Sequence, residues 1–257
     1  MLRRFDYSWV ILTVGFVVLF FNSGTRFAFG LVLRPMTDDL DLSRSSLSLA
    51  ATTFFIVSAL AIPIVGRLLD RYSLRFVLAS SALISAVGIG FMGAVTAQWQ
   101  VFALYGLVYG IGNSGTSIAP VGVMISRWFS RRRGIANSAA ISGNAIGQLI
   151  IIMLLACFLT SLTWRGAFIA LGVATFVFVI PLILLAVHEH PAPQAPVRQA
   201  SGADEMPETL LSEGGGLRQL FASRQLWMLV GIYTICGFQD FLVATHIVAF
   251  AEDQGVG

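Results

Sequence analysis

The chain has 257 residues, of which 56% are hydrophobic and only 11% are charged, and its formal net charge is +3. Because soluble domains carry about 25% charged residues, this composition excludes an ordinary soluble globule. The sixteen basic residues are all arginine and form no long basic stripe, which argues against nucleic-acid binding. Both cysteines lie within apolar runs, so the composition indicates neither a metal site nor a cofactor.

Seven apolar runs follow one another along the chain, each long enough to cross a lipid bilayer as a helix. Together they contain only two formally charged side chains, Arg26 and Asp240. The first run is longer than a signal-peptide core and no small-residue cleavage site closes it, so we expect it to remain as a membrane helix. The runs cover residues 9–33, 45–65, 76–95, 100–126, 134–160, 166–187 and 225–250.

One long polar segment separates the sixth run from the seventh. Residues 188–224 are rich in Pro, Ala, Gln and Gly and cannot bury a core, which predicts a linker. We therefore expect a six-helix bundle at residues 1–187, then this linker, then one further helix within residues 225–257. The expected fold class is an all-α integral membrane protein.

The arginines between the runs predict the orientation. Twelve lie in loops on the same side as the N-terminus and three on the opposite side, at Arg34, Arg44 and Arg165. Because arginine-rich loops remain in the cytoplasm, we expect a cytoplasmic N-terminus, a cytoplasmic linker and a location in the inner or plasma membrane.

Four stretches carry a family resemblance. Residues 66–75 read GRLLDRYSLR and resemble the signature between helices 2 and 3 of the major facilitator superfamily. Residues 128–137, which read WFSRRRGIAN, resemble the entry to helix 5 of its monocarboxylate and oxalate/formate porters. Residues 6–9 and 164–168 are also similar to that group. The resemblance implies the six-helix N-terminal bundle of that superfamily, followed by the first helix of an incomplete C-terminal bundle.

The same resemblance implies a function: secondary active transport of small organic solutes, above all carboxylate anions, by alternating access. It assigns a gating role to Gly66, Asp70, Arg71 and Arg75, where we expect Asp70 to accept from arginines and to cap a helix N-terminus. Alternating access needs a second bundle. We therefore expect the chain to be truncated and inactive alone, unless a partner chain supplies the missing half.

The two charges within the apolar runs are the first candidates for a binding site, because a charge in a bilayer needs a partner, water or a function. Asn22 and Arg26 share one face of the first run, and Asp240 lies in the seventh. We expect Arg26 to attract an anionic substrate, and Asp240 to pair with it or to take a coupling proton. The alternative is that Arg26 extends to the outer lipid headgroups.

Polar residues of the fourth and fifth runs line the cavity or form hydrogen bonds between helices, two interpretations that the sequence leaves open. These candidates are Tyr109, Asn113, Ser117 and Pro120 on one face of the fourth run, and Asn137, Asn144 and Gln148 on the fifth. Glycines four residues apart, at 106 and 110 and at 143 and 147, predict close approach of helix backbones.

Two other classes of protein compete with a transporter. Residues 112–115, Gly-Asn-Ser-Gly, resemble the motif of rhomboid-type intramembrane serine proteases, with Ser114 as nucleophile and His246 as base. No glycine follows His246 at the spacing of that family, so we expect no enzyme. A seven-helix receptor would place its N-terminus outside, against the arginine bias, and retinal binding is excluded because the chain has no lysine.

Overall fold

The computed structural model describes residues 2–40, 43–129, 133–158, 163–187 and 223–253, and for residues 2–6, 44, 158 and 240–253 it describes the backbone only. All regular elements in these ranges are helices. The chain divides into two units, Met1–Gln199 and Ala200–Gly257, and each is described by itself.

Long helices form over five of the first six apolar runs, as expected. They are α1 (Leu2–Leu40), α2 (Arg44–Arg71), α3 (Leu74–Met92), α7 (Arg133–Phe158) and the sequence α8 (Trp164–Ala174), η2 (Thr175–Val179) and α9 (Ile180–Ala186). Within the described residues, five spans are long and apolar enough to cross a membrane: Tyr7–Leu40, Ser45–Arg71, Leu74–Met92, Arg133–Cys157 and Trp164–Ala186. The composition and these spans together give an all-α membrane fold.

The ends of the helices differ from those of the apolar runs that predicted them. The first continues to Leu40, well beyond the expected end at residue 33. The sixth begins at Trp164 because the hydroxyl of Thr163 accepts a hydrogen bond from the amide of Gly166 and caps the helix. Hydropathy marks the part of a helix that suits lipid, whereas caps and backbone hydrogen bonds decide where the helix ends.

The fourth run is not one helix, so the expectation of a continuous helix over residues 100–126 was wrong. The run forms α4 (Gln98–Val101), the π-helical η1 (Phe102–Tyr109), α5 (Gly110–Gly115) and α6 (Ile118–Trp128). The backbone of Ser117 is extended, with φ −74° and ψ 177°. Pro120 explains the break, because in a continuous helix its ring would meet the carbonyl of Thr116, while in the first turn of α6 its missing amide costs nothing.

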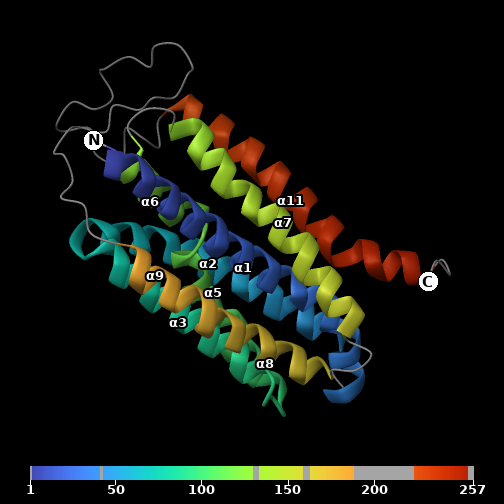
Figure 1. Ribbon diagram of the computed structural model, residues 1–257. Coiled ribbons are helices and arrows are strands. Elements are labelled where there is room, and N and C mark those ends of the chain that lie inside the picture. Colours follow the sequence, from blue (N-terminus) through green and yellow to red (C-terminus); the bar gives the residue numbers. More distant parts are fainter. Residues whose placement is uncertain (1, 41–42, 130–132, 159–162, 188–222, 254–257) are drawn as a thin grey trace. The chain divides into compact units, whose positions relative to one another are not determined.

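Close glycine contacts hold α7 along α1, as the glycine spacing predicted (Figure 1). A Cβ atom at Gly143 would lie 2.5 Å from the carbonyl oxygen of Phe16, and one at Gly147 would lie 2.5 Å from the Cα atom of Phe20. On the other side of the bundle α3 lies beside α8 and α9 and also contacts η1 and α5. Of the pieces of the fourth run, η1 and α5 pack between α2 and α3, whereas α6 packs against α1 and α7.

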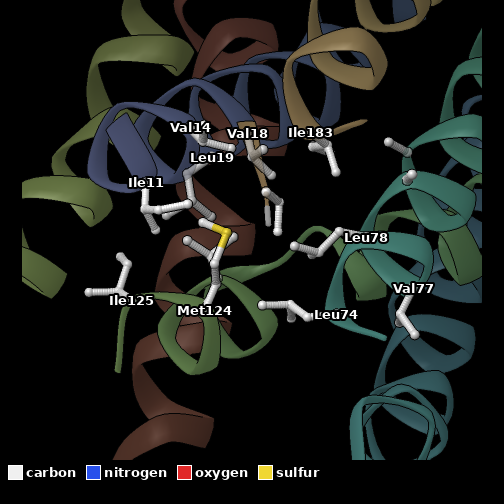
Figure 2. Close-up of a cluster of buried hydrophobic side chains, with 14 of the residues drawn as sticks. Ile11, Val14, Val18, Leu19, Leu74, Val77, Leu78, Met124, Ile125 and Ile183 are labelled. Atoms are coloured by element: carbon white, nitrogen blue, oxygen red, sulfur yellow. The ribbon is translucent and has the colours of Figure 1, made fainter. Parts of the chain in front are cut away.

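Apolar side chains fill the bundle near the N-terminal end of α1. Figure 2 shows Ile11 and Leu19 of α1 facing Met124 of α6, with Leu78 of α3 and Ile183 of α9 nearby. Each of these five side chains is at most 1% exposed. Four elements that are distant in sequence therefore share one core at this end of the first unit.

The described part of the second unit is a single helix, α11 (Arg224–Asp253), which covers the seventh apolar run. Its start is capped by Ser223, whose hydroxyl accepts from the amide of Leu226. The expected linker at residues 188–224 lies almost wholly outside the described residues, so the expected division of the chain remains a prediction.

Candidate functional site

Asn22 connects α1 to the break in the fourth run. Its side-chain amide donates to the carbonyl of Asn113 at 3.1 Å and to the hydroxyl of Thr116 at 2.8 Å. The Asn113 carbonyl lies in the last turn of α5 and also accepts from the amide of Thr116, so Asn22 adds a bond from another helix at this end. The polar face predicted for α1 therefore meets the end of α5 and not lipid.

Tyr109 and Asn113 extend this polar region into the bundle. The Asn113 amide donates to the hydroxyl of Tyr109 at 3.3 Å, and both side chains are buried. Because Ser117 is extended, neither it nor Pro120 continues the helical face of Tyr109 and Asn113. The structure thus brings Asn22, Tyr109 and Asn113 together as hydrogen-bonded neighbours. Asn22 forms a bond between helices, and all three residues also line a small cavity, so both interpretations apply here.

Arg26 lies one turn beyond Asn22 on α1 and is half-buried. Its guanidinium carbon lies 4.4 Å from the centre of the Phe27 ring, and its backbone carbonyl accepts from the hydroxyl of Tyr105 at 3.4 Å. A cation beside aromatic rings and phenolic hydroxyls is suited to attract an anion.

Stacked aromatic rings support this region from α1, α2 and η1. The rings of Phe29 and Tyr105 are 3.9 Å apart, and those of Phe54 and Tyr109 are 5.3 Å apart. Tyr105 and Tyr109 also stack on each other, at 5.4 Å. Such contacts hold the two tyrosine rings in place, with the hydroxyl of Tyr105 at the backbone carbonyl of Arg26.

The remaining candidates are not part of this hydrogen-bonded group. Asn144 and Gln148 lie half-buried on α7, beside the glycines that contact α1. The carbonyl oxygen of the Asn144 side chain is buried and has no hydrogen bond to any described residue. The side chain of Asp240 lies outside the described residues, so its expected pairing with Arg26 remains a prediction.

The expected gating motif lies at the end of α2 and the start of α3. Gly66, Asp70 and Arg71 are exposed and Arg75 is half-buried. The expectation that Asp70 caps a helix was wrong, because Ser73 occupies the N-cap position of α3. A pairing of Asp70 with arginines remains a prediction, since part of the nearby arginine-rich turn lies outside the described residues.

Sequence reasoning missed two connections at the N-terminal end of the bundle. The guanidinium of Arg127 in α6 donates to the carbonyl of Leu69, the residue before Asp70, at 3.2 Å. The hydroxyl of Tyr7 donates to the carbonyl of Ala186 at the end of α9, at 2.6 Å. Both are side chain to backbone bonds, which leave no mark in residue types or spacing.

At the other end of the bundle, charged side chains join the C-terminal part of α1 to the start of α8. Arg165 of α8 forms an ion pair of 2.9 Å with Asp39 of α1 and donates to the carbonyl of Val95 at 2.7 Å. The indole nitrogen of Trp164 donates to the same carboxylate at 3.2 Å. In the sequence the Trp-Arg pair stands out only as part of a family motif. An acidic residue at the end of another apolar run, Asp39, is the signal from which its ion pair could have been predicted.

Ser114, the nucleophile of the protease alternative, is 1% exposed. Its hydroxyl donates to the carbonyl of Ile111 in the same helix at 2.6 Å. This is the usual hydrogen bond of a structural serine in a membrane helix. The side chain of His246 lies outside the described residues.

Comparison with known proteins identifies the family. The sequence profile of the Major Facilitator Superfamily matches residues 15–257. The chain is 24% identical to the uncharacterized MFS-type transporter YcxA of Bacillus subtilis, over 97% of this chain and 59% of the relative. It is also 24% identical to human monocarboxylate transporter 11 (98% and 51%) and to the oxalate:formate antiporter of Oxalobacter formigenes (96% and 56%). The chain thus spans about half the length of the curated relatives that it matches. The profile matches nearly the whole chain, and the apolar helices agree with a membrane transporter fold. The chain therefore belongs to the Major Facilitator Superfamily.

Proposed function

We propose that the protein takes part in secondary active transport of small carboxylate anions by alternating access, and that Arg26 is the anion-attracting residue. The observation that carries the proposal is the placement of a half-buried arginine within a span that is long and apolar enough to cross a membrane, beside the ring of Phe27 and one turn from Asn22. Monocarboxylates and the oxalate/formate pair named for two relatives are all carboxylates, which supports this substrate class.

The charge of Arg26 gives it a role that packing alone does not explain. An intramembrane cation is costly unless water, a partner or a ligand stabilises it. The ring of Phe27 lies against the guanidinium. A guanidinium presents its donors in a fixed fork, and a carboxylate can accept two of them at once. The hydrogen bond from Asn22 to the carbonyl of Asn113 joins α1 to α5 one turn before Arg26, and so helps to position Arg26 along the bundle.

The proposal includes an orientation and a coupling. The arginine bias supports a cytoplasmic N-terminus. Asp240 is the proposed counter-charge of Arg26, or the residue that takes a coupling proton. Because alternating access rocks one bundle against another, we propose that transport needs a second bundle, either in the same polypeptide or in a partner.

Uptake of radiolabelled anions into proteoliposomes tests the proposal. The protein in its full expressed form is compared with Arg26→Gln, and with Arg34→Gln as a matched control, because Arg34 lies on the same helix but is exposed. Charge-assisted hydrogen bonds contribute about 1.5–3 kcal/mol, so we expect Arg26→Gln to weaken substrate affinity roughly 10- to 100-fold. Equal uptake by wild type and Arg26→Gln would remove Arg26 from the site.

A catalytic role for Ser114 has no comparable support. Its hydroxyl is buried and is already a donor within its own helix.

A further inference from the structure

A small cavity lies in the first unit, where α1 and α3 meet the π-helical η1 and η2 and the end of α5. Its volume is about 20 Å³. Residues of α1, α3, η1, α5 and η2 line it, and it borders the end of α5 where the fourth run breaks. A cavity needs about 10–15 Å³, measured in this way, to hold one water molecule, so this one has room for one water and not for a carboxylate solute.

Two buried hydroxyls in the lining have no hydrogen-bond partner among the described residues. They belong to Thr25 of α1 and Ser85 of α3, which are 4% and 6% exposed. Leaving such a group unsatisfied away from water costs about 1–3 kcal/mol. Both hydroxyls therefore need a partner that the described protein atoms do not supply.

Other hydroxyls of the bundle avoid this cost within their own helices. Thr175, which also lines the cavity, donates to the carbonyl of Leu171 at 2.8 Å, and Thr13 donates to that of Trp9 at 3.0 Å. This bond to the preceding turn is open to any serine or threonine in a helix. Thr25 and Ser85 do not make it, which is expected if each has a better partner inside the cavity.

Tyr109 contributes a third group. Its hydroxyl oxygen accepts from the Asn113 amide, and no acceptor for its own proton occurs within the described part of the chain. The other polar lining groups are already used, because Asn22 donates both to the carbonyl of Asn113 and to the hydroxyl of Thr116. Three residues with such hydroxyls, each from a different element, thus line one cavity.

We propose that this cavity is a binding site for a single water molecule, held by the hydroxyls of Thr25, Ser85 and Tyr109. Buried waters typically make about three hydrogen bonds to groups that would otherwise be unsatisfied, which matches this set. The water connects α1, α3 and η1 beside the break before α6. The water site does not involve the proposed substrate, so it can be tested separately from the proposed transport function.

Radiolytic labelling of the purified full-length protein tests the site. An X-ray pulse forms hydroxyl radicals from ordered internal water, and these add oxygen to the side chains that touch it. We expect several-fold more oxygen addition at Tyr109 than at Tyr105. Tyr105 is the matched control, because it lies one turn away on the same element, is similarly buried at 3% exposed and does not line the cavity.

Variants then remove the hydroxyls. The double variant Thr25→Val with Ser85→Ala reduces labelling of Tyr109 to the level of Tyr105. Thr25→Ser keeps the hydroxyl and retains the labelling, and so does Ser114→Ala, whose hydroxyl bonds within its own helix. Equal labelling of the two tyrosines in wild type overturns the proposal, as does unchanged labelling in a folded double variant. If the double variant does not fold, the wild-type comparison of Tyr109 with Tyr105 decides alone.

Discussion

The contact between α1 and α7 makes Gly147 a sensitive position. A Cβ atom there would lie 2.5 Å from the Cα atom and 2.6 Å from the carbonyl carbon of Phe20. Real Cβ atoms do not approach backbone this closely, and backbone atoms of a packed helix cannot turn aside as a flexible side chain can. We therefore expect Gly147→Ala to force the two helices apart.

Two opposing effects determine how much Gly147→Ala lowers the free energy of unfolding. Replacing a helical glycine by alanine gains about 0.5–1 kcal/mol of helix propensity. Overpacking typically costs about 1–3 kcal/mol, and contact with rigid backbone on a neighbouring helix places Gly147 at the upper end of that range. The expected net loss for Gly147→Ala is about 2 kcal/mol in the free energy of unfolding.

Gly134, near the start of the same helix, is the matched control. A Cβ atom there meets no described atom within 4 Å. We expect Gly134→Ala to change the free energy of unfolding by less than about 1 kcal/mol. Unfolding by SDS in mixed micelles, followed by circular dichroism, measures both variants. Equal stability of the two variants would refute the reasoning that backbone contact at Gly147 holds α7 against α1.

Three further predictions follow from contacts between distant elements. Asn22→Leu removes two hydrogen bonds between α1 and the end of α5, and we expect it to lower the free energy of unfolding in mixed micelles by about 1 kcal/mol; an unchanged value would show that these bonds add nothing. Arg165→Ala removes the ion pair with Asp39 and bonds to two backbone carbonyls, so it should destabilise more than Asp39→Asn, whose exposed ion pair contributes about 0–1 kcal/mol; the reverse order contradicts this. In a variant without the native cysteines, a single cysteine at Tyr72 should react with an impermeant maleimide only from the cytoplasm, and one at Trp99 only from outside, since both side chains are well exposed.

Much of the fold could be predicted from hydropathy and glycine spacing. Continuous apolar runs placed five of the first six helices, because lipid-facing segments must satisfy their own backbone hydrogen bonds. The glycines at 143 and 147 predicted a close approach of helix backbones, and the structure identifies α1 as the partner. Hydropathy did not reveal the break at Ser117, because every residue around it is compatible with a membrane helix. The residue that indicates the break is Pro120, because its ring would clash with the carbonyl four residues earlier in a continuous helix.

The candidate site was predictable only in part. The polar face of α1 identified Asn22 and Arg26, and helical spacing identified Tyr109 and Asn113. The bond from Asn22 to Thr116 could not be predicted, because it depends on how two helices 94 residues apart in sequence are placed. The same holds for the unsatisfied hydroxyls of Thr25 and Ser85, since threonine and serine in a helix usually bond to the preceding turn.

Direct binding tests the central claim that Arg26 attracts a carboxylate anion. Isothermal titration of the purified protein with oxalate, formate and a monocarboxylate, each beside its uncharged amide, separates affinity from transport. The account predicts that at least one of these anions binds, that its amide does not, and that Arg26→Gln weakens binding roughly 10- to 100-fold while Arg34→Gln does not. Binding of the anion with unchanged affinity to Arg26→Gln, or equal binding of the amide to wild type, would contradict it.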